Sequence, residues 1–332
     1  MRSGMRAAIV VWVMGAGLLS AGVAEAQSLP KDAAARVELY PIPTLTISDK
    51  QFLNGDADGT PVTVSGELRL AQGSGRTPVV VLMHGSSGVG AGMEPWVRTF
   101  NAMGISTFVI DGFTGRGLTA VGPNQALLGR LNFIVDIYRS LDILAKHPRV
   151  DPERIVLMGF SRGGQAALFA SLTRFDKLWN KSGIRFAAYI PFYPDCSTSY
   201  VGDTDVADKP IRIFHGTPDD YNPVASCKAY VARLQEAKRD VVLTEYPDSE
   251  HAFDIGLLGI SSKVVSANAQ TVRHCHIREG EGGVLMNVDT LTPFTYKDPC
   301  VEFNPHVGGN PATAEQARKA VSDFLTVLFK LG

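Results

Sequence analysis

The sequence is short of net charge, of cysteine and, beyond its N-terminal stretch, of long apolar runs. Its 332 residues carry 32 lysines and arginines against 33 aspartates and glutamates, so the formal net charge is -1. This balance argues against a broad basic surface for nucleic acid and against an acidic tail. The absence of internal repeats, heptads and low-complexity tracts excludes solenoids and coiled coils. Downstream of the N-terminal stretch, no apolar run is long enough to span a bilayer.

The N-terminal stretch has the pattern of an export signal. Two arginines lie before or beside an apolar run over residues 7–19, which is too short for a comfortable membrane span. Ala24-Glu25-Ala26 then supplies a cleavage site, and we predict a signal peptide over residues 1–26 that is cleaved after Ala26. An uncleaved anchor is the alternative. Cleavage would leave a periplasmic or secreted protein that no longer contacts the membrane.

The four cysteines favour two disulfides if the chain is exported, because an even number in an oxidising compartment is typical of paired thiols. Three pairings are possible, and the simplest joins sequence neighbours, Cys196 with Cys227 and Cys275 with Cys300. Each bridge would close a loop of about 30 residues and contribute roughly 3–4 kcal/mol in the chain-entropy model. Buried free thiols are the alternative.

Short apolar runs alternate with helical patterns along most of the chain. This alternation predicts an α/β fold with a mostly parallel central sheet and helices on both faces. We assign residues 27–44 to an N-terminal surface arm, residues 45–332 to this domain and residues 255–312 to an irregular, glycine-rich insertion. Within the domain, residues 61–70 should form an antiparallel edge strand and residues 125–146 the longest helix. Ligands bind such sheets outside the carboxyl ends of the strands.

The motif Gly159-Phe160-Ser161-Arg162-Gly163 lies between a buried apolar run and a helical pattern. A strand, a Gly-x-Ser-x-Gly turn and a helix together are typical of a nucleophile elbow. The turn would hold Ser161 in strained backbone geometry, and flanking glycines would avoid collisions with the neighbouring strand and helix. We therefore predict that Ser161 is a nucleophile; a chance match is the alternative.

Two further polar residues follow predicted strands, Asp219 and His251. The chain order serine, acid, histidine is that of one layout of serine hydrolases. His251 would act as general base towards Ser161, and Asp219 would fix the tautomer and orientation of the imidazole.

An oxyanion formed at such a serine needs two preset donors. We expect these to be the backbone N–H of Arg162, directly after the nucleophile, and that of Ser86, with Ser87 as second choice. One such donor contributes on the order of 3 kcal/mol to the transition state.

Four segments together resemble the dienelactone hydrolase family of the α/β-hydrolase superfamily. They are His84-Gly85-Ser86-Ser87-Gly88, the elbow, Gly216-Thr217-Pro218-Asp219-Asp220 and His251-Ala252-Phe253. Phe192-Tyr193-Pro194 with Cys196, and Pro223 with Cys227, also resemble exported members of that family. The resemblance covers roughly residues 45–330 and implies an α/β-hydrolase fold and ester hydrolysis.

The chain departs from this family in two ways. Ser161 stands where the dienelactone enzymes themselves use cysteine, and residues 255–312 are longer than the usual connection from the histidine to the last helix. Both departures put a dienelactone substrate in doubt, though not ester hydrolysis.

Several polar residues have structural interpretations. Asp220 is an alternative acid, but the Gly-x-x-Asp spacing of the family favours Asp219. His84 and His215 end strands and should bond the local backbone. The group His274, Cys275, His276 and His306 matches no standard zinc spacing, so we expect no metal and no cofactor.

Three residues are candidates for substrate contact. Trp96 and Phe113 would line an acyl pocket, with core packing as the alternative. Arg116 is a candidate for contact with an acidic substrate, but we favour surface or structural pairing for it and for the Arg162 side chain.

The favoured function is a secreted serine hydrolase that cleaves small-molecule carboxylic esters through an acyl-enzyme. A peptidase or amidase, a lactone hydrolase and a non-catalytic binding protein on the same scaffold are alternatives, because fold alone does not decide activity. Residues 255–312 leave directly from the His251 loop, so we expect them to form one wall of the acyl-binding cleft. Packing on the sheet edge is the alternative. The sequence gives no indication of the oligomeric state.

Overall fold

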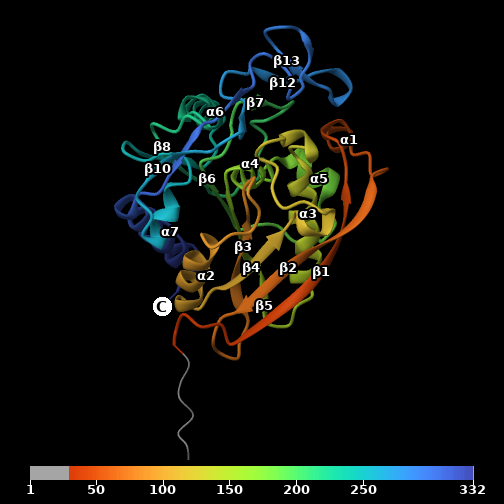
Figure 1. Cartoon of the computed structure of the whole chain (residues 1–332). Coiled ribbons are helices and arrows are strands. Elements are labelled where there is room, and N and C mark those ends of the chain that lie inside the picture. Colours follow the sequence, from red (N-terminus) through yellow and green to blue (C-terminus); the bar gives the residue numbers. More distant parts are fainter. Residues whose placement is uncertain (1–29, 332) are drawn as a thin grey trace, which may run out of the picture. The chain divides into compact units, whose positions relative to one another are not determined.

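The computed structural model describes residues 30–331 (Figure 1). The chain divides into the units Met1–Pro30 and Lys31–Gly332, and the second contains the site. The predicted signal peptide and its cleavage site lie outside the described residues.

An eight-stranded sheet forms the centre of this second unit. Its strand order is β1-β2-β4-β3-β5-β6-β8-β9; β1 and β2 pair antiparallel, as do β2 and β4, and every other neighbouring pair is parallel. All seven residues of β3 are buried, which explains why this strand reads as a continuous apolar run. The strands are β1 (Arg36–Thr46), β2 (Thr60–Leu70), β3 (Thr77–Met83), β4 (Ser106–Asp111), β5 (Val150–Phe160), β6 (Ala188–Phe192), β8 (Ile211–Gly216) and β9 (Val241–Tyr246).

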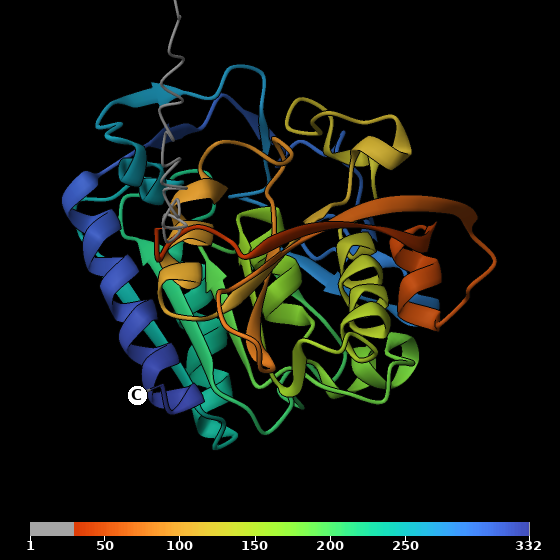
Figure 2. The same cartoon turned by 90° about the horizontal axis from the view of Figure 1, so that it is seen from below.

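Helices cover both faces of the sheet and create two cores. Alternate residues of β3 point to opposite faces: Val79, Val81 and Met83 pack in the core that includes α3, α4 and α5, and Val80 and Leu82 in the core that includes α2 and α7. Figure 2 shows α7 and α3 on opposite sides of the sheet. The helices are α1 (Asp49–Asn54), α2 (Met93–Ala102), α3 (Asn132–Leu144), α4 (Arg162–Phe169), α5 (Thr173–Trp179), α6 (Val224–Glu236) and α7 (Pro311–Phe329). The predicted fold class is confirmed. None of the helices over residues 30–331 has the length and apolar character of a membrane span.

The N-terminal region differs from the prediction. The polar, proline-bearing composition of residues 27–44 predicts a surface arm, whereas Arg36–Thr46 forms the edge strand β1 and pairs with β2 over its whole length. Pro41 and Pro43 are tolerated because an edge strand leaves part of its N–H positions without a ladder partner. β2 is therefore the second strand and not the edge.

The helix predicted over residues 125–146 is interrupted. A 3₁₀ turn, η2 (Gln125–Leu127), is followed by a break, and α3 begins only at Asn132. At the break, Gly129 lies so close to another loop that an added Cβ would come within 2.9 Å of the Ile47 carbonyl oxygen. The longest of the described helices is α7, with 19 residues.

Residues 255–312 contain short paired strands instead of irregular chain alone. β10 pairs with β16 and β11 with β15, while β14, β13 and β12 extend to β7, which lies outside the segment (Figure 1). Both predicted disulfides, Cys196–Cys227 and Cys275–Cys300, are present, and the second closes this segment on itself. The elements are η3 (Phe253–Leu258), β10 (Lys263–Val265), β11 (Gln270–Thr271), β12 (Ile277–Glu279), η4 (Glu281–Gly283), β13 (Leu285–Asn287), β14 (Thr292–Pro293), β15 (Glu302–Phe303) and β16 (His306–Gly308), with β7 at Thr198–Ser199 and η1 at Thr114–Arg116.

Candidate active site

Ser161 occupies a strained turn between β5 and α4. Its backbone angles are φ 54° and ψ -117°, a conformation that costs energy for any residue with a side chain. A Cβ on Gly159 would lie 2.1 Å from the Gly163 carbonyl oxygen, and one on Gly163 would lie 2.2 Å from that of Met83. The glycines of the motif therefore allow the close approach of strand and helix that raises Ser161 above the sheet.

The structure brings Ser161, His251 and Asp219 into one hydrogen-bonded chain. His251 Nε2 lies 2.8 Å from Ser161 Oγ, and His251 Nδ1 lies 2.8 Å from Asp219 Oδ2. The other carboxylate oxygen of Asp219 accepts the backbone N–H groups of Tyr221 and Asn222, each at 2.8 Å. Because these two bonds fix the carboxylate, Oδ2 stays directed at the imidazole, which is the geometry that orients a general base.

Asp220 serves a different purpose from its neighbour. Its two carboxylate oxygens accept the backbone N–H of His306 at 2.7 Å and face the His306 ring at 2.8 Å. Arg273 adds an ion pair at 3.2 Å. Asp220 thus bonds β16 of the insertion to the loop after β8, which also carries Asp219. It has no bond to His251.

The loop after β3 lies directly against the nucleophile. A Cβ on Gly85 would come within 3.2 Å of Ser161 Cβ. The Ser86 carbonyl accepts a hydrogen bond from the Val121 N–H at 2.8 Å, and the Ser86 hydroxyl bonds the side chain of Gln125. These bonds hold the loop in place. Over residues 30–331, the backbone N–H groups of Ser86 and Arg162 donate to no other residue, and Arg162 is the first residue of α4. Both N–H groups are free to meet a ligand oxygen beside Ser161.

The three predicted substrate contacts have structural partners in the interior of the protein. Trp96 is fully buried and donates from Nε1 to Asp254 at 3.0 Å, and Phe113 is buried with its ring 4.6 Å from that of His84. Arg116 forms an ion pair with Asp136 in the core, at 2.7 Å. Trp96 and Phe113 belong to the two hydrophobic cores, and none of the three residues lines either cavity beside Ser161.

His84 and His215 bond their local backbone. His84 Nδ1 lies 2.7 Å from the Gly85 carbonyl, and its Nε2 accepts the Gly112 N–H at 3.0 Å, so the ring is neutral with its proton on Nδ1. Burial lowers the pKa of His84 to about 4. His215 Nδ1 lies 3.0 Å from the Gly216 carbonyl, and burial lowers the pKa of this ring as well.

The four residues that suggested a metal are dispersed. Cys275 is in a disulfide, His276 faces Asp289, His306 faces Asp220 and His274 lies 3.7 Å from Glu302. Within the described part of the chain, no three potential metal ligands come together.

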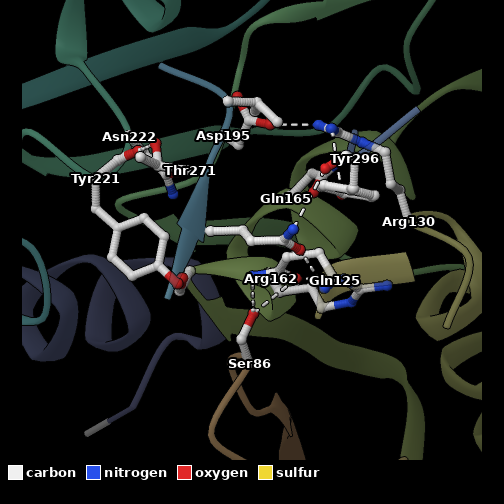
Figure 3. A pocket seen from close by; sticks show the side chains of 13 residues that line it. Ser86, Gln125, Arg130, Arg162, Gln165, Asp195, Tyr221, Asn222, Thr271 and Tyr296 are labelled. Carbon is white, nitrogen blue, oxygen red and sulfur yellow. Dashed lines mark hydrogen bonds and ion pairs between the residues drawn. The ribbon is translucent and has the colours of Figure 1, made fainter. Parts of the chain in front are cut away.

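Two cavities meet at Ser161. The first, which we call the apolar cleft, has a volume of about 320 Å³ and is lined by Met93, Phe160, Ile255 and Val307 together with His251. The second, the polar recess, has about 40 Å³ (Figure 3). Ser86, Ser161 and Tyr221 line both cavities. Figure 3 shows the recess walls, where Arg130 faces Asp195 and Ser86 faces Gln125.

The insertion contributes to both walls. Ile255, Ser266 and Val307 line the apolar cleft, and Val272 and Tyr296 are among its residues on the polar recess. Ile255, Ser266, Val272 and Val307 lie outside the loop closed by the Cys275–Cys300 bridge and Tyr296 lies inside it, while the hairpin of β12 and β13 extends towards β7.

Sequence reasoning missed the residues that surround the histidine. The rings of Tyr193 and Tyr221 lie 4.7 Å and 4.6 Å from that of His251. Tyr193 donates its hydroxyl to Asp254 at 2.5 Å, and Trp96 donates to the other oxygen of that carboxylate. Burial raises the pKa of Asp254 against these two bonds. The available signal was position: Tyr193 follows β6 directly, where side chains meet the ligand edge of the sheet.

Comparisons with known proteins identify the family through its model. The model of the dienelactone hydrolase family matches residues 66–272. Curated relatives include the probable carboxylic ester hydrolase LipM of Mycobacterium tuberculosis, 27% identical over 37% of this chain and 38% of that protein, and the thiohydrolase aneE of Aspergillus aculeatus, 31% identical over 40% and 39%. The chain thus spans about two fifths of the length of these relatives.

The fold is shared with solved structures. A dienelactone hydrolase-like promiscuous phosphotriesterase from metagenomic libraries superposes with a TM-score of 0.53 at 16% identity, over 89% of this chain and 98% of that one. At this identity the match shows the fold alone. With the family model covering more than half of the chain, the protein belongs to the dienelactone hydrolase family, on the α/β-hydrolase fold.

Proposed function

We propose that this protein is a serine hydrolase that cleaves carboxylic esters through an acyl-enzyme. The observation that carries the proposal is the hydrogen-bonded chain from Ser161 through His251 to Asp219, set on a strained turn where two cavities meet. Strained backbone conformations persist at functional sites, where the surrounding structure holds a reactive group towards a ligand.

The chemistry follows from the positions of these atoms. His251 Nε2 removes the proton of Ser161 as Oγ forms a bond to the ester carbon, and the carbonyl oxygen becomes an oxyanion. The N–H groups of Ser86 and Arg162 stabilise that charge. The imidazolium then protonates the alcohol oxygen as the carbon–oxygen bond breaks. His251 then takes a proton from water as the water oxygen bonds the acyl carbon, and it returns that proton to Ser161 Oγ as the carbon–Oγ bond breaks and the acid leaves; no step needs a cofactor.

The relatives support the class of bond. One of them is named a probable carboxylic ester hydrolase and another a thiohydrolase. An amidase or a dienelactone hydrolase would use the same three residues, and the rates on matched esters, anilides and lactones discriminate among them. A binding protein without activity is disfavoured by the complete triad.

We also propose export to a periplasm or the extracellular space. Two disulfides, which persist in oxidising compartments, support this placement together with the signal-like sequence over residues 1–26.

The proposal is tested by Ser161→Ala. We expect the variant to keep the wild-type melting temperature and to lose on the order of 10⁶ in kcat on 4-nitrophenyl esters, since removal of a triad nucleophile has that effect. Near-normal turnover by the variant would refute the assignment. Matched anilides should be hydrolysed far more slowly than esters by the wild type.

A further inference from the structure

The two cavities at Ser161 lie on chemically different sides of the nucleophile. The leaving oxygen of an ester must receive its proton from the general acid. His251, together with Ala252 and Asp254, lines the apolar cleft and does not line the polar recess. The departing alcohol therefore belongs in the apolar cleft, and the acyl group faces the recess.

Buried donors without partners surround the recess. Arg130 and Arg162 are only 3% and 6% exposed, and Gln165 is 4% exposed. Arg130 Nε, Arg162 Nε and Gln165 Nε2 are buried and have no hydrogen-bond partner among the described residues. A buried donor left unpaired is destabilising, because its hydrogen bond to water has been lost without replacement. All three residues line the recess, so an acyl group with an acceptor oxygen would bring a partner close to these donors.

The two arginines at the recess differ in their ion pairs. Arg130 pairs directly with Asp195. Arg162 instead donates to neutral oxygens, Gln125 Oε1 at 2.7 Å and the carbonyls of Leu128 and Gly129. Asp49, the other carboxylate near both arginines, accepts its bond from the Leu131 N–H, and burial raises its pKa. The Arg162 guanidinium thus touches no carboxylate among residues 30–331.

The recess is small. Its volume of about 40 Å³ holds roughly one to three waters, because a water needs at least about 10–15 Å³. A group of a few atoms beyond the ester carbonyl would fill it, whereas a long acyl chain would not.

We propose that the polar recess is the acyl subsite and that it selects short acyl groups with an oxygen acceptor beyond the ester carbonyl. The acceptor is an ether, keto or carboxylate oxygen that receives the free donors of Gln165, Arg130 and Arg162, while an apolar alcohol occupies the apolar cleft. This inference rests on the proposed ester hydrolysis. Arg116, which forms an ion pair in the core, is not one of the cations that line the recess.

The test compares 2-naphthyl esters whose acyl groups are matched in shape. Methoxyacetate is compared with butanoate, and hemimalonate with 3-methylbutanoate, each kcat/KM being divided by the rate of alkaline hydrolysis of that ester. We expect at least a tenfold preference for the acceptor-bearing member of one pair or both. A gain with methoxyacetate identifies hydrogen bonding to a neutral oxygen, and a gain confined to hemimalonate identifies attraction to the guanidinium groups. A ratio near one in both pairs would overturn the proposal.

Gln165→Leu links the preference to the recess. The variant removes a donor that has no partner, so we expect its melting temperature to be unchanged or higher, while the acceptor preference falls at least threefold. Gln165→Met is the second variant, should leucine disturb α4. A purely structural Gln165 would give the reverse pattern, lower stability with an unchanged ratio, and would contradict the proposal.

Val307→Ala in the apolar cleft is the matched control. It should change the preference between naphthyl and methyl alcohols and leave the acyl ratio within twofold. Hydrolysis of all four esters without acyl preference would sink the recess assignment alone. Absence of any ester turnover that depends on Ser161 would instead refute the proposed function.

Discussion

At the scale of single residues, three of the eight described non-glycine residues with positive φ lie at the site. Ser161, Tyr193 and Ala252 all have positive φ, at 54°, 36° and 62°, although none is glycine. All three line the apolar cleft. Such conformations persist where the surrounding structure over-determines them, and here the bonds and packing around the triad do so.

The adjacent carboxylates Asp219 and Asp220 offer a matched pair of variants. Asp219→Asn should lower kcat by about 10⁴ on esters, because an amide at this position favours the wrong tautomer of His251. Asp220→Asn, which changes the same atoms one residue along, should alter kcat less than tenfold, since Asp220 bonds His306 and Arg273 instead. Steady-state kinetics of both variants check the assignment, and a larger loss from Asp220→Asn would reverse it.

His84 gives the fold a pH dependence that can be calculated in sign and size. Its pKa is about 4 in the folded protein, against an ordinary value near 6.5 in the unfolded chain. As the pH falls below 6.5, His84 becomes protonated in the unfolded chain, whereas in the folded protein it stays neutral until about pH 4. The free energy of unfolding therefore decreases between about pH 6.5 and pH 4. Between pH 7 and pH 5 the loss is about 2 kcal/mol.

The comparison with His84→Gln isolates this contribution. Glutamine keeps one donor and one acceptor but does not titrate, and other groups cancel between the two proteins. The free energy of unfolding in urea should fall by about 2 kcal/mol more for the wild type than for the variant between those pH values. Parallel pH profiles would show that His84 is not held neutral by the fold.

At the scale of elements, the C-terminal end of the insertion bonds the loop that carries His251. Gly308 donates its N–H to the His251 carbonyl at 2.9 Å, and Asn310 donates to that of Phe253 at 3.0 Å. His306 of β16 also bonds Asp220, on the loop that carries Asp219. The segment therefore holds the histidine loop in addition to lining both cavities.

The Cys275–Cys300 bridge should stabilise this arrangement. Its removal in Cys275→Ser/Cys300→Ser frees a loop with a sequence separation of 25 residues. We expect a loss of about 3 kcal/mol of stability. We also expect a higher KM, because Val272 and Tyr296, which lie near the two bridged cysteines in the chain, line the recess. Differential scanning calorimetry and ester kinetics provide the measurements. An unchanged melting temperature, or free thiols detected in the denatured wild type, would contradict the role given to the bridge.

At the scale of the whole molecule, sequence reasoning succeeded where local chemistry is decisive. The elbow, the order of the three polar residues and the cysteine spacing are local signals, and the structure brings Ser161, Asp219 and His251 together and forms both disulfides. The strand β1 was missed because Pro41 and Pro43 obscure an edge strand whose partner lies outside its own sequence.

Direction is the property that the sequence did not reveal. Trp96, Phe113 and Arg116 lie near the site in the chain but point into the cores. Gln165, Arg130 and Asn222 reach the recess from α4 and two loops, and only tertiary packing unites them. A helix side chain that faces a ligand, such as Gln165, belongs to no sequence motif and does not alter the hydrophobic periodicity of its helix, so the sequence does not reveal it.

The most direct test of the account is the acyl-enzyme itself. Wild-type protein mixed with excess 4-nitrophenyl butanoate and quenched in acid during the burst should carry one butanoyl group, and peptide mass mapping should place it on Ser161. Ser161→Ala should carry none. Turnover of the ester with no adduct during the burst, or with an adduct on another residue that persists in Ser161→Ala, would contradict the central claim.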